Sequence, residues 1–81
     1  MDNTKTGGYL AALRKDAGMT QQEAADRLGV SNKTISKWES GGGFPDIAIL
    51  PALAELYGVT ADDILAGETV RQSTGGRQVE Q

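Results

Sequence analysis

The 81-residue chain contains no cysteine and no histidine, and these two absences exclude several classes of protein. Without cysteine, neither a disulfide framework nor a thiolate metal site is possible. Without histidine, the chain lacks the commonest general base and the commonest metal ligand. It also has no glycine-rich phosphate loop, and its carboxylates and hydroxyls are not arranged as a catalytic site. We therefore expect neither an enzyme nor a protein that holds a metal ion or a cofactor.

Long apolar stretches are also missing from the sequence. No run approaches the roughly 18 residues that span a bilayer, and no signal-peptide pattern opens the chain. The length suits one small domain with a single core, and no second domain is left to bind a small molecule. The sequence therefore predicts a cytoplasmic protein with no membrane partner.

Positively charged residues are fewer than negatively charged ones, which gives a formal net charge of −3. An acidic protein is an unfavourable partner for a nucleic acid. The charge is uneven, however, since residues 1–40 carry a balance of +1 and residues 41–81 a balance of −4. One face can therefore be locally positive while the other is acidic, and we expect non-specific DNA affinity to be weak and strongly salt-dependent.

The spacing of apolar and capping residues predicts an all-α fold with five helices and no strand. Residues 1–6 are polar and lack periodicity, so they are expected to form a flexible arm. The folded domain is expected to cover residues 7–67, and the polar residues 68–81 are expected to form a disordered tail. The helices are predicted at about residues 7–17, 21–28, 32–40, 47–57 and 61–66.

The last two helices carry more detailed expectations. Asp46 is expected to cap the fourth helix, and Ile47 to supply apolar surface to it. Pro51 cannot donate a backbone hydrogen bond, so a first turn should precede the main part of this helix. In the fifth helix, Ile64 and Leu65 are expected to turn inward.

The most informative stretch is residues 20–41, which predicts two short helices joined by a tight turn. Thr20 and Glu23 match a capping box at the start of the first of these helices. Gly29 tolerates the left-handed backbone conformation that ends a helix. Ser31 is a good N-cap for the next helix. This arrangement is typical of a helix-turn-helix motif.

The second helix of this motif has one apolar and one polar face. Ile35 and Trp38 lie three residues apart on the apolar side. Trp38 could be interpreted as a platform on which bases stack, but its position on this stripe favours a place in the core. The other face has only hydrogen-bonding side chains, as expected of a helix that enters the DNA major groove; these are Asn32, Lys33, Thr34, Ser36 and Lys37.

The segments LRKDAGMTQQEAADRLGVSNKTISKWESG and PDIAILPALAELYGVTADDIL resemble the Cro/phage-repressor family of helix-turn-helix regulators, also called the Xre type. The resemblance covers about residues 7–66. It implies a five-helix bundle of the phage-repressor DNA-binding type that forms a homodimer. Such a dimer binds double-stranded operator DNA at two half-sites about one helical turn apart.

The resemblance also implies which residues contact DNA bases. Asn32 can offer its amide to an adenine edge, and Lys33 can donate to O6 and N7 of guanine. Lys37 is one turn further on and could reach either a base or a phosphate, a choice that the sequence leaves open. The base-reading positions that carry over from the family are Ser31, Asn32, Lys33, Ser36 and Lys37.

Phosphate contacts and one ion pair carry over in the same way. Gln21 matches a glutamine that grips phosphate at the start of the second helix, where free N–H groups already favour an anion. Thr20 is expected to cap this helix and to touch the same phosphate, and Thr34 is expected to bind the DNA backbone. Arg14 and Glu39 match a pair that forms a partly buried ion pair in phage repressors.

The chain departs from the family after the third helix. In the family this connector often carries basic or polar side chains that touch phosphate, whereas here it is Gly41-Gly42-Gly43. Bare backbone amides can nevertheless approach a phosphate closely. For the dimer interface we expect the fifth helix and the end of the fourth, where Ile49 and Leu56 offer spare apolar surface.

Two functions remain as hypotheses. In the first, the chain is a sequence-specific regulator that represses transcription by occupying an operator, although an activator would have the same features. In the second, the fold serves as an antitoxin-like or adaptor module, with the acidic half or the polar tail holding a protein partner.

Overall fold

The computed structural model describes residues 3–70 of the chain. Within this range the protein is entirely α-helical and has no strand, which confirms the predicted fold class. No helix among these residues is long and apolar enough to cross a membrane. The five helices are α1 (Asn3–Asp16), α2 (Gln21–Leu28), α3 (Asn32–Glu39), α4 (Leu50–Tyr57) and α5 (Ala61–Ala66).

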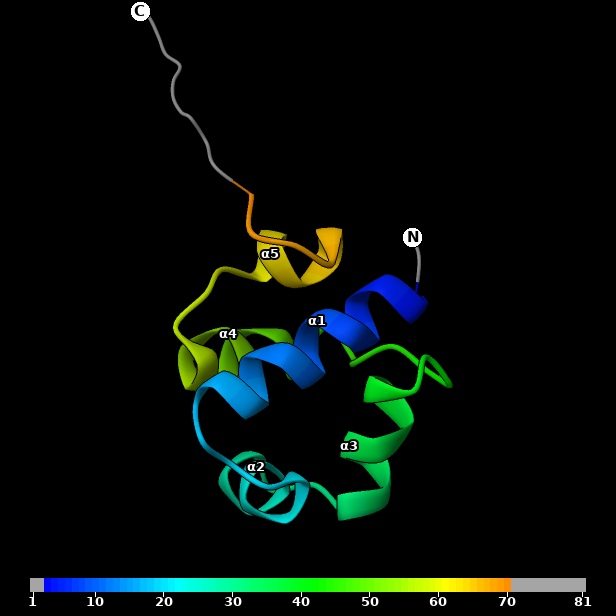
Figure 1. The fold of residues 1–81 in the computed structure, drawn as a ribbon, viewed down its shortest axis with the longest axis vertical. Coiled ribbons are helices and arrows are strands. Elements are labelled where there is room, and N and C mark those ends of the chain that lie inside the picture. The colour runs from blue at the N-terminus through cyan, green and yellow to red at the C-terminus, as the bar shows by residue number, and fades with distance from the viewer. Residues whose placement is uncertain (1–2, 71–81) are drawn as a thin grey trace, which may run out of the picture.

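Helix α1 lies in the centre of the bundle (Figure 1). It packs against α3 on one side and α5 on the other, while α2 packs against α3 and α4 packs against α5. Ala24 and Ala25 of α2 are fully buried, and their small side chains let α3 cross closely over α2. The hydrophobic core consists of Leu10, Ala24, Ala25, Ile35, Trp38, Leu50, Leu53 and Ile64.

The predicted capping signals of α2 and α3 act as expected. Thr20 and Glu23 form a reciprocal capping box at the start of α2. The helix ends at Gly29, whose φ of 73° is left-handed. Ser31 then caps α3 by accepting a hydrogen bond from the N–H of Thr34 at 3.1 Å. These local interactions fix the angle at which α3 leaves α2.

The expected flexible arm is wrong for residues 3–6, because α1 begins at Asn3 instead of Gly7. The cause is tertiary packing. Thr6 is 2% exposed, and its hydroxyl donates to the carbonyl of Ile64 at 3.0 Å. At Gly7, an added Cβ would lie 2.5 Å from the carbonyl oxygen of Trp38, so the two backbones touch. Long-range contacts therefore stabilise a turn of helix that the local sequence does not favour.

At the other end, the folded part extends to Val70, so the expected start of the tail at residue 68 is also wrong. The N–H of Val70 donates to the buried carboxylate of Asp63 at 2.8 Å, and the hydroxyls of Tyr9 and Thr69 are 3.3 Å apart. The hydrogen bonds from Val70 and then Thr60 lower the pKa of Asp63. The remainder of the predicted tail, residues 71–81, lies outside the described residues.

Helix α4 begins at Leu50, after a turn in which the N–H of Ile49 donates to the carbonyl of Asp46. The expectation that Asp46 caps this helix is therefore wrong, because the N-cap residue is Ile49 and no side chain caps the helix. The turn leaves Ile47 85% exposed, so this residue does not contribute to the core. Leu65 of α5 is also exposed, at 37%, because only one side of this short helix faces α1 and α4.

Candidate nucleic-acid interface

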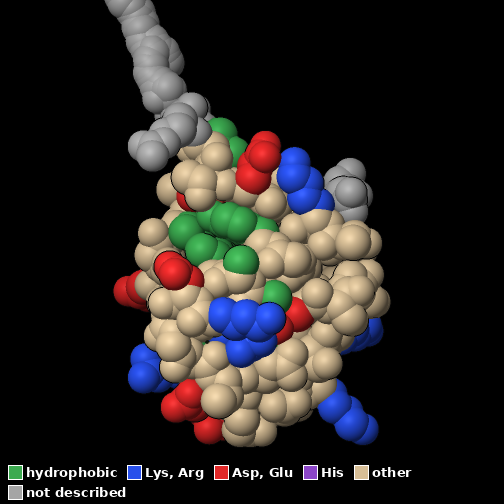
Figure 2. Space-filling model, in the orientation of Figure 1, with side chains coloured by type: hydrophobic (Ala, Val, Ile, Leu, Met, Phe, Trp, Pro, Cys, Tyr) green, Lys and Arg blue, Asp and Glu red, His purple; other side chains and the backbone are tan. Residues whose placement is uncertain are grey.

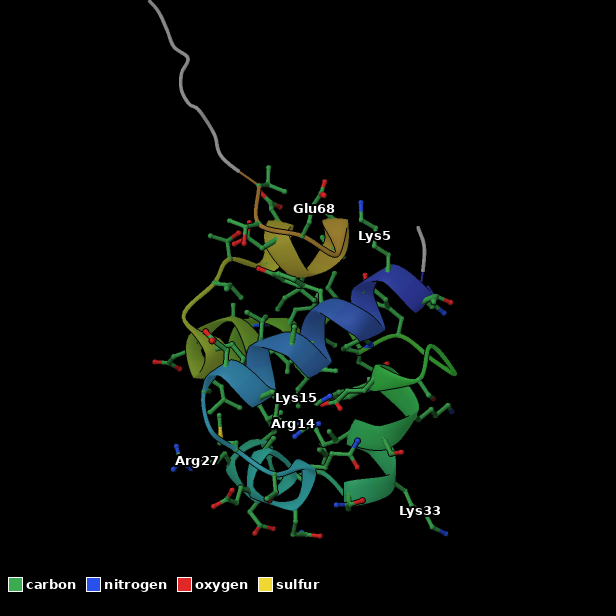
Figure 3. All side chains as sticks on the ribbon, in the orientation of Figure 1. Lys5, Arg14, Lys15, Arg27, Lys33 and Glu68 are labelled. Carbon is green, nitrogen blue, oxygen red and sulfur yellow. The ribbon has the colours of Figure 1, made fainter. Side chains whose placement is uncertain are left out.

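Helix α3 presents one buried and one exposed face. Ile35 and Trp38 are 2% and 8% exposed, which confirms Trp38 as a core residue. On the opposite face Lys33, Ser36 and Lys37 are exposed. Figure 3 shows the Lys33 side chain pointing away from the bundle. No described part of the chain covers this face, so it is free to contact another molecule.

The N-terminal turn of α3 is more constrained than its middle. The hydroxyls of Ser31 and Thr34 lie 2.9 Å apart and form a hydrogen bond in addition to the cap. Asn32 is partly buried. Ser31 and Thr34 therefore hold each other at the start of the helix, which orders the turn that carries Asn32 and Lys33.

An ion pair joins the end of α3 to α1 behind this exposed face. Nε and Nη2 of Arg14 donate to the two carboxylate oxygens of Glu39 at 2.7 and 2.9 Å. A third guanidinium donor, Nη1, binds the carbonyl of Met19 at 2.8 Å. The two side chains are only 11% and 8% exposed. The expected Arg14–Glu39 pair is thus present, buried and bidentate.

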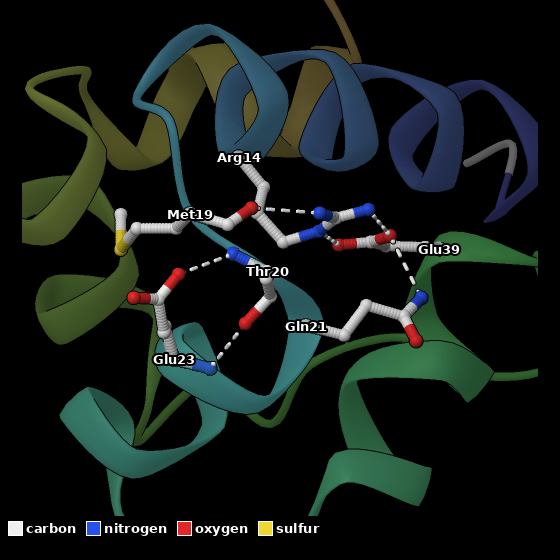
Figure 4. Close-up of polar contacts among 6 residues, drawn as sticks. All are labelled: Arg14, Met19, Thr20, Gln21, Glu23 and Glu39. Carbon is white, nitrogen blue, oxygen red and sulfur yellow. Dashed lines mark hydrogen bonds and ion pairs between the residues drawn. The ribbon is translucent and has the colours of Figure 1, made fainter.

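Gln21 belongs to the same network, a contact that the sequence did not indicate. Its amide nitrogen donates to Oε1 of Glu39 at 3.1 Å, so one carboxylate connects α1, α2 and α3 (Figure 4). The hydrogen bonds to Glu39 raise the pKa of Arg14 and outweigh the opposing effect of desolvation. Burial raises the pKa of Tyr57 in α4, and the charge of Glu39 adds to this effect. The network therefore fixes the start of α2 relative to the end of α3.

The expected site residues fall into two groups. Ser31, Asn32, Lys33, Ser36 and Lys37 all belong to α3 or its cap, and Thr34 lies among them. Thr20 and Gln21 lie at the start of α2, where the Thr20 side chain is engaged in capping. Gln21 connects the two groups through Glu39. No group of three or more acidic residues within residues 3–70 could hold a metal ion.

A family model described as helix-turn-helix (HTH_3) matches residues 10–64, which is more than half of the chain. The chain belongs to the helix-turn-helix family. The match includes all of α2 to α4, the second half of α1 and most of α5, so the observed bundle is the family's domain.

Several helix-turn-helix proteins are similar to this one. The HTH-type transcriptional activator BcrR of Enterococcus faecalis is 42% identical over 59 residues, which cover 73% of this chain and 29% of BcrR. The HTH-type transcriptional regulator ImmR of Bacillus subtilis (strain 168) is 38% identical over 64 residues, 79% of this chain and 50% of ImmR. The crystal structure of the clp gene regulator ClgR from Corynebacterium glutamicum superposes with a TM-score of 0.73 at 25% identity, covering 83% of this chain and 71% of that one.

These comparisons confirm the resemblance to Xre-type helix-turn-helix regulators. The chain spans half or less of the length of BcrR and ImmR, so what it shares with them is the helix-turn-helix domain. Both relatives are named as transcriptional proteins and neither as an enzyme or an adaptor. The adaptor hypothesis is therefore not favoured.

Proposed function

We propose that this protein is a sequence-specific regulator that binds double-stranded operator DNA, with α3 in the major groove. It acts as a homodimer in the cytoplasm, where a bacterial chromosome lies, and represses transcription by occupying its operator. Occupancy alone is enough to block a promoter, so repression needs no surface beyond the DNA interface.

The observation that carries this proposal is the exposed polar face of α3. Lys33 and Ser36 are exposed, while the same helix is anchored by the buried Ile35 and Trp38. A helix held on one side by the core and free on the other can enter a groove about 12 Å wide. If this face had been covered by the protein's own chain, no base contact would be possible.

The chemistry of the face supports base recognition. Lys33 is suited to donate to O6 and N7 of guanine, and Asn32 to form a bidentate amide contact with adenine. Ser36 is shorter and is assigned a single hydrogen bond to a base edge. Ser31 lies at the helix start, where its methylene group can approach a thymine methyl while its oxygen remains a cap.

Phosphate contacts are proposed at the edges of the same face. Gln21 lies in the first turn of α2, where unsatisfied N–H groups and the helix dipole favour an anion. One of its two amide N–H donors binds Glu39, and the second is assigned to a DNA phosphate. Thr20 is assigned to the same phosphate through its backbone, and Thr34 to the DNA backbone on the side of α3.

A homodimer would double this interface. We expect a pseudo-palindromic operator with half-sites about 10–10.5 base pairs apart. Figure 2 shows hydrophobic side chains gathered on one face between the levels of α5 and α1. Leu65 of α5 is exposed, whereas Ile49 and Leu56 are partly buried against the core. This supports α5 as the main part of a dimer interface.

Selection of binding sites from a random duplex library tests the proposal directly. Enrichment of a two-fold symmetric sequence is the expected outcome, and Lys33→Ala should then cost about 1–3 kcal/mol and relax preference at one base pair. Arg27→Ala is the matched control, because Arg27 is exposed on α2 and points away from the bundle on the side opposite Lys33 (Figure 3). Failure to enrich any sequence, or equal affinity of Lys33→Ala and the parent for the selected operator, would contradict the proposal.

A further inference from the structure

A hollow of about 400 Å³ lies between α3 and the connector that leads from it to α4. Figure 1 shows this connector as the green loop beyond the end of α3. Trp38 and Phe44 contribute apolar surface to the hollow. Its polar lining is formed by Thr34, Lys37, Gly43 and Asp46.

The side chain of Lys37 runs along the glycines of the connector. A Cβ added to Gly42 would lie 3.3 Å from Cγ of Lys37, and one added to Gly43 would lie 2.9 Å from Cε. The absence of side chains at these two positions therefore makes room for the lysine. Lys37 therefore lines the hollow, with its Cε beside Gly43.

Two donors that line this hollow are unused within residues 3–70. The Lys37 ammonium forms no ion pair, and the Gly43 N–H has no hydrogen-bond partner. The neighbouring N–H groups of Gly41 and Gly42 are already bound to carbonyls of α3. One positive charge and one free backbone donor are thus available for an anion.

We infer that Lys37 binds a phosphate of the DNA backbone beside the connector and does not contact a base edge. This inference rests on the proposed function. Lys37 lies near the C-terminal end of α3, whereas a recognition helix contacts bases mainly with its N-terminal residues. The connector itself has no basic side chain between residues 41 and 46, so Lys37 supplies the cation there.

Asp46 lines the same hollow and opposes this contact. Its carboxylate repels a phosphate, and the Lys37 ammonium offsets that repulsion. Asp46→Asn should therefore tighten binding to every duplex, and by more than Asp62→Asn does. Asp62 is an exposed carboxylate on α5 and measures the general effect of removing one negative charge.

The decisive experiment compares Lys37→Gln with Lys33→Gln on the selected operator and on a scrambled duplex, between 50 and 200 mM salt. For Lys37→Gln we expect equal losses on both duplexes and unchanged base preference. The slope of log K against log salt should fall by about 0.9 per bound copy, so over this fourfold salt range the variant loses about 3.5-fold less affinity than the parent as a monomer and about 12-fold less as the proposed dimer. Lys33→Gln should instead relax preference at one base pair.

Gly43→Ala provides an independent test, because its Cβ must displace Cε of Lys37, the flexible end of a side chain. In the parent protein it should weaken binding to both duplexes equally, and in the Lys37→Gln background it should cause no further loss of affinity. If circular dichroism shows that the variants are folded, two results would contradict the inference. One is a Gly43→Ala variant with full parental affinity, and the other is a double variant in which the affinity losses of Gly43→Ala and Lys37→Gln add. An altered base preference in Lys37→Gln with an unchanged salt slope would overturn this inference alone, whereas a parent that binds no duplex would overturn the proposed function and this inference with it.

Discussion

Replacing Arg14 by alanine removes a guanidinium that makes three hydrogen bonds. Two of them neutralise Glu39, and the third satisfies the carbonyl of Met19. In the variant, the Glu39 carboxylate would retain only the amide of Gln21 as a side-chain donor. Because the Glu39 side chain is 8% exposed, water cannot fully replace the lost charge.

The size of the effect follows from this burial. Removing one partner of a buried ion pair costs about 3–5 kcal/mol. In a domain of this size each 1 kcal/mol lowers Tm by roughly 4 °C or more, so Arg14→Ala should lower Tm by at least about 12 °C. Lys15 is its exposed neighbour in α1, and loss of an exposed charge is worth about 0–1 kcal/mol. Lys15→Ala is therefore the matched control.

Thermal unfolding followed by circular dichroism measures both variants. If Arg14→Ala is too unstable to fold, the double variant Arg14→Met with Glu39→Met keeps the test available. Replacing both partners by apolar side chains leaves no stranded charge, so the double variant should be more stable than Arg14→Met alone. Equal small shifts for Arg14→Ala and Lys15→Ala, or a double variant less stable than Arg14→Met, would refute the reasoning.

Two further predictions concern packing and pH. Gly7→Ala should strongly destabilise the domain, because its Cβ would meet the Trp38 carbonyl at 2.5 Å, whereas Gly8→Ala, with nothing within 4 Å, should stabilise it by about 0.5–1 kcal/mol. Urea unfolding would show this, and equal effects of the two changes would exclude the close contact of α1 with α3. Backbone hydrogen bonds hold the pKa of Asp63 below its ordinary value of 3.8. Its stabilising effect is therefore present above pH 3.8 and is lost as the pH falls from there through the lower folded pKa. Between neutral pH and about pH 3, Asp63→Asn should lose less stability than the parent protein, whereas Asp62→Asn should lose as much as the parent. Identical losses of stability in all three proteins would contradict this assignment.

The exposed polar face of α3 and the caps of α2 and α3 were predictable because their signals are local. The Thr20–Glu23 capping box and the Ser31 cap involve residues three apart, so the sequence alone shows them. The alternation of apolar and polar positions in α3 likewise needs only the period of a helix. The Arg14–Glu39 pair was predictable for another reason, which is that its two positions match those of a known family.

Most of the errors lie where distant segments meet. Thr6 looks like part of a polar arm, yet it is buried because its hydroxyl reaches the Ile64 carbonyl. Ile47 looks like a core residue, yet the turn before α4 exposes it. The contact of Gln21 with Glu39 was also missed, since an amide at a helix start has many possible partners and only the position of α3 selects one.

Residues close in the chain therefore determine the five helices, their caps and the polar face of α3, because hydrogen bonds within a helix and the periodicity of its side chains need no distant partner. Assembly of the bundle determines where α1 begins, how the Glu39 carboxylate joins three helices, and that Lys37 lies along Gly42 and Gly43. Each of these depends on groups that are brought within contact distance only when the helices pack, and no local pattern encodes that distance.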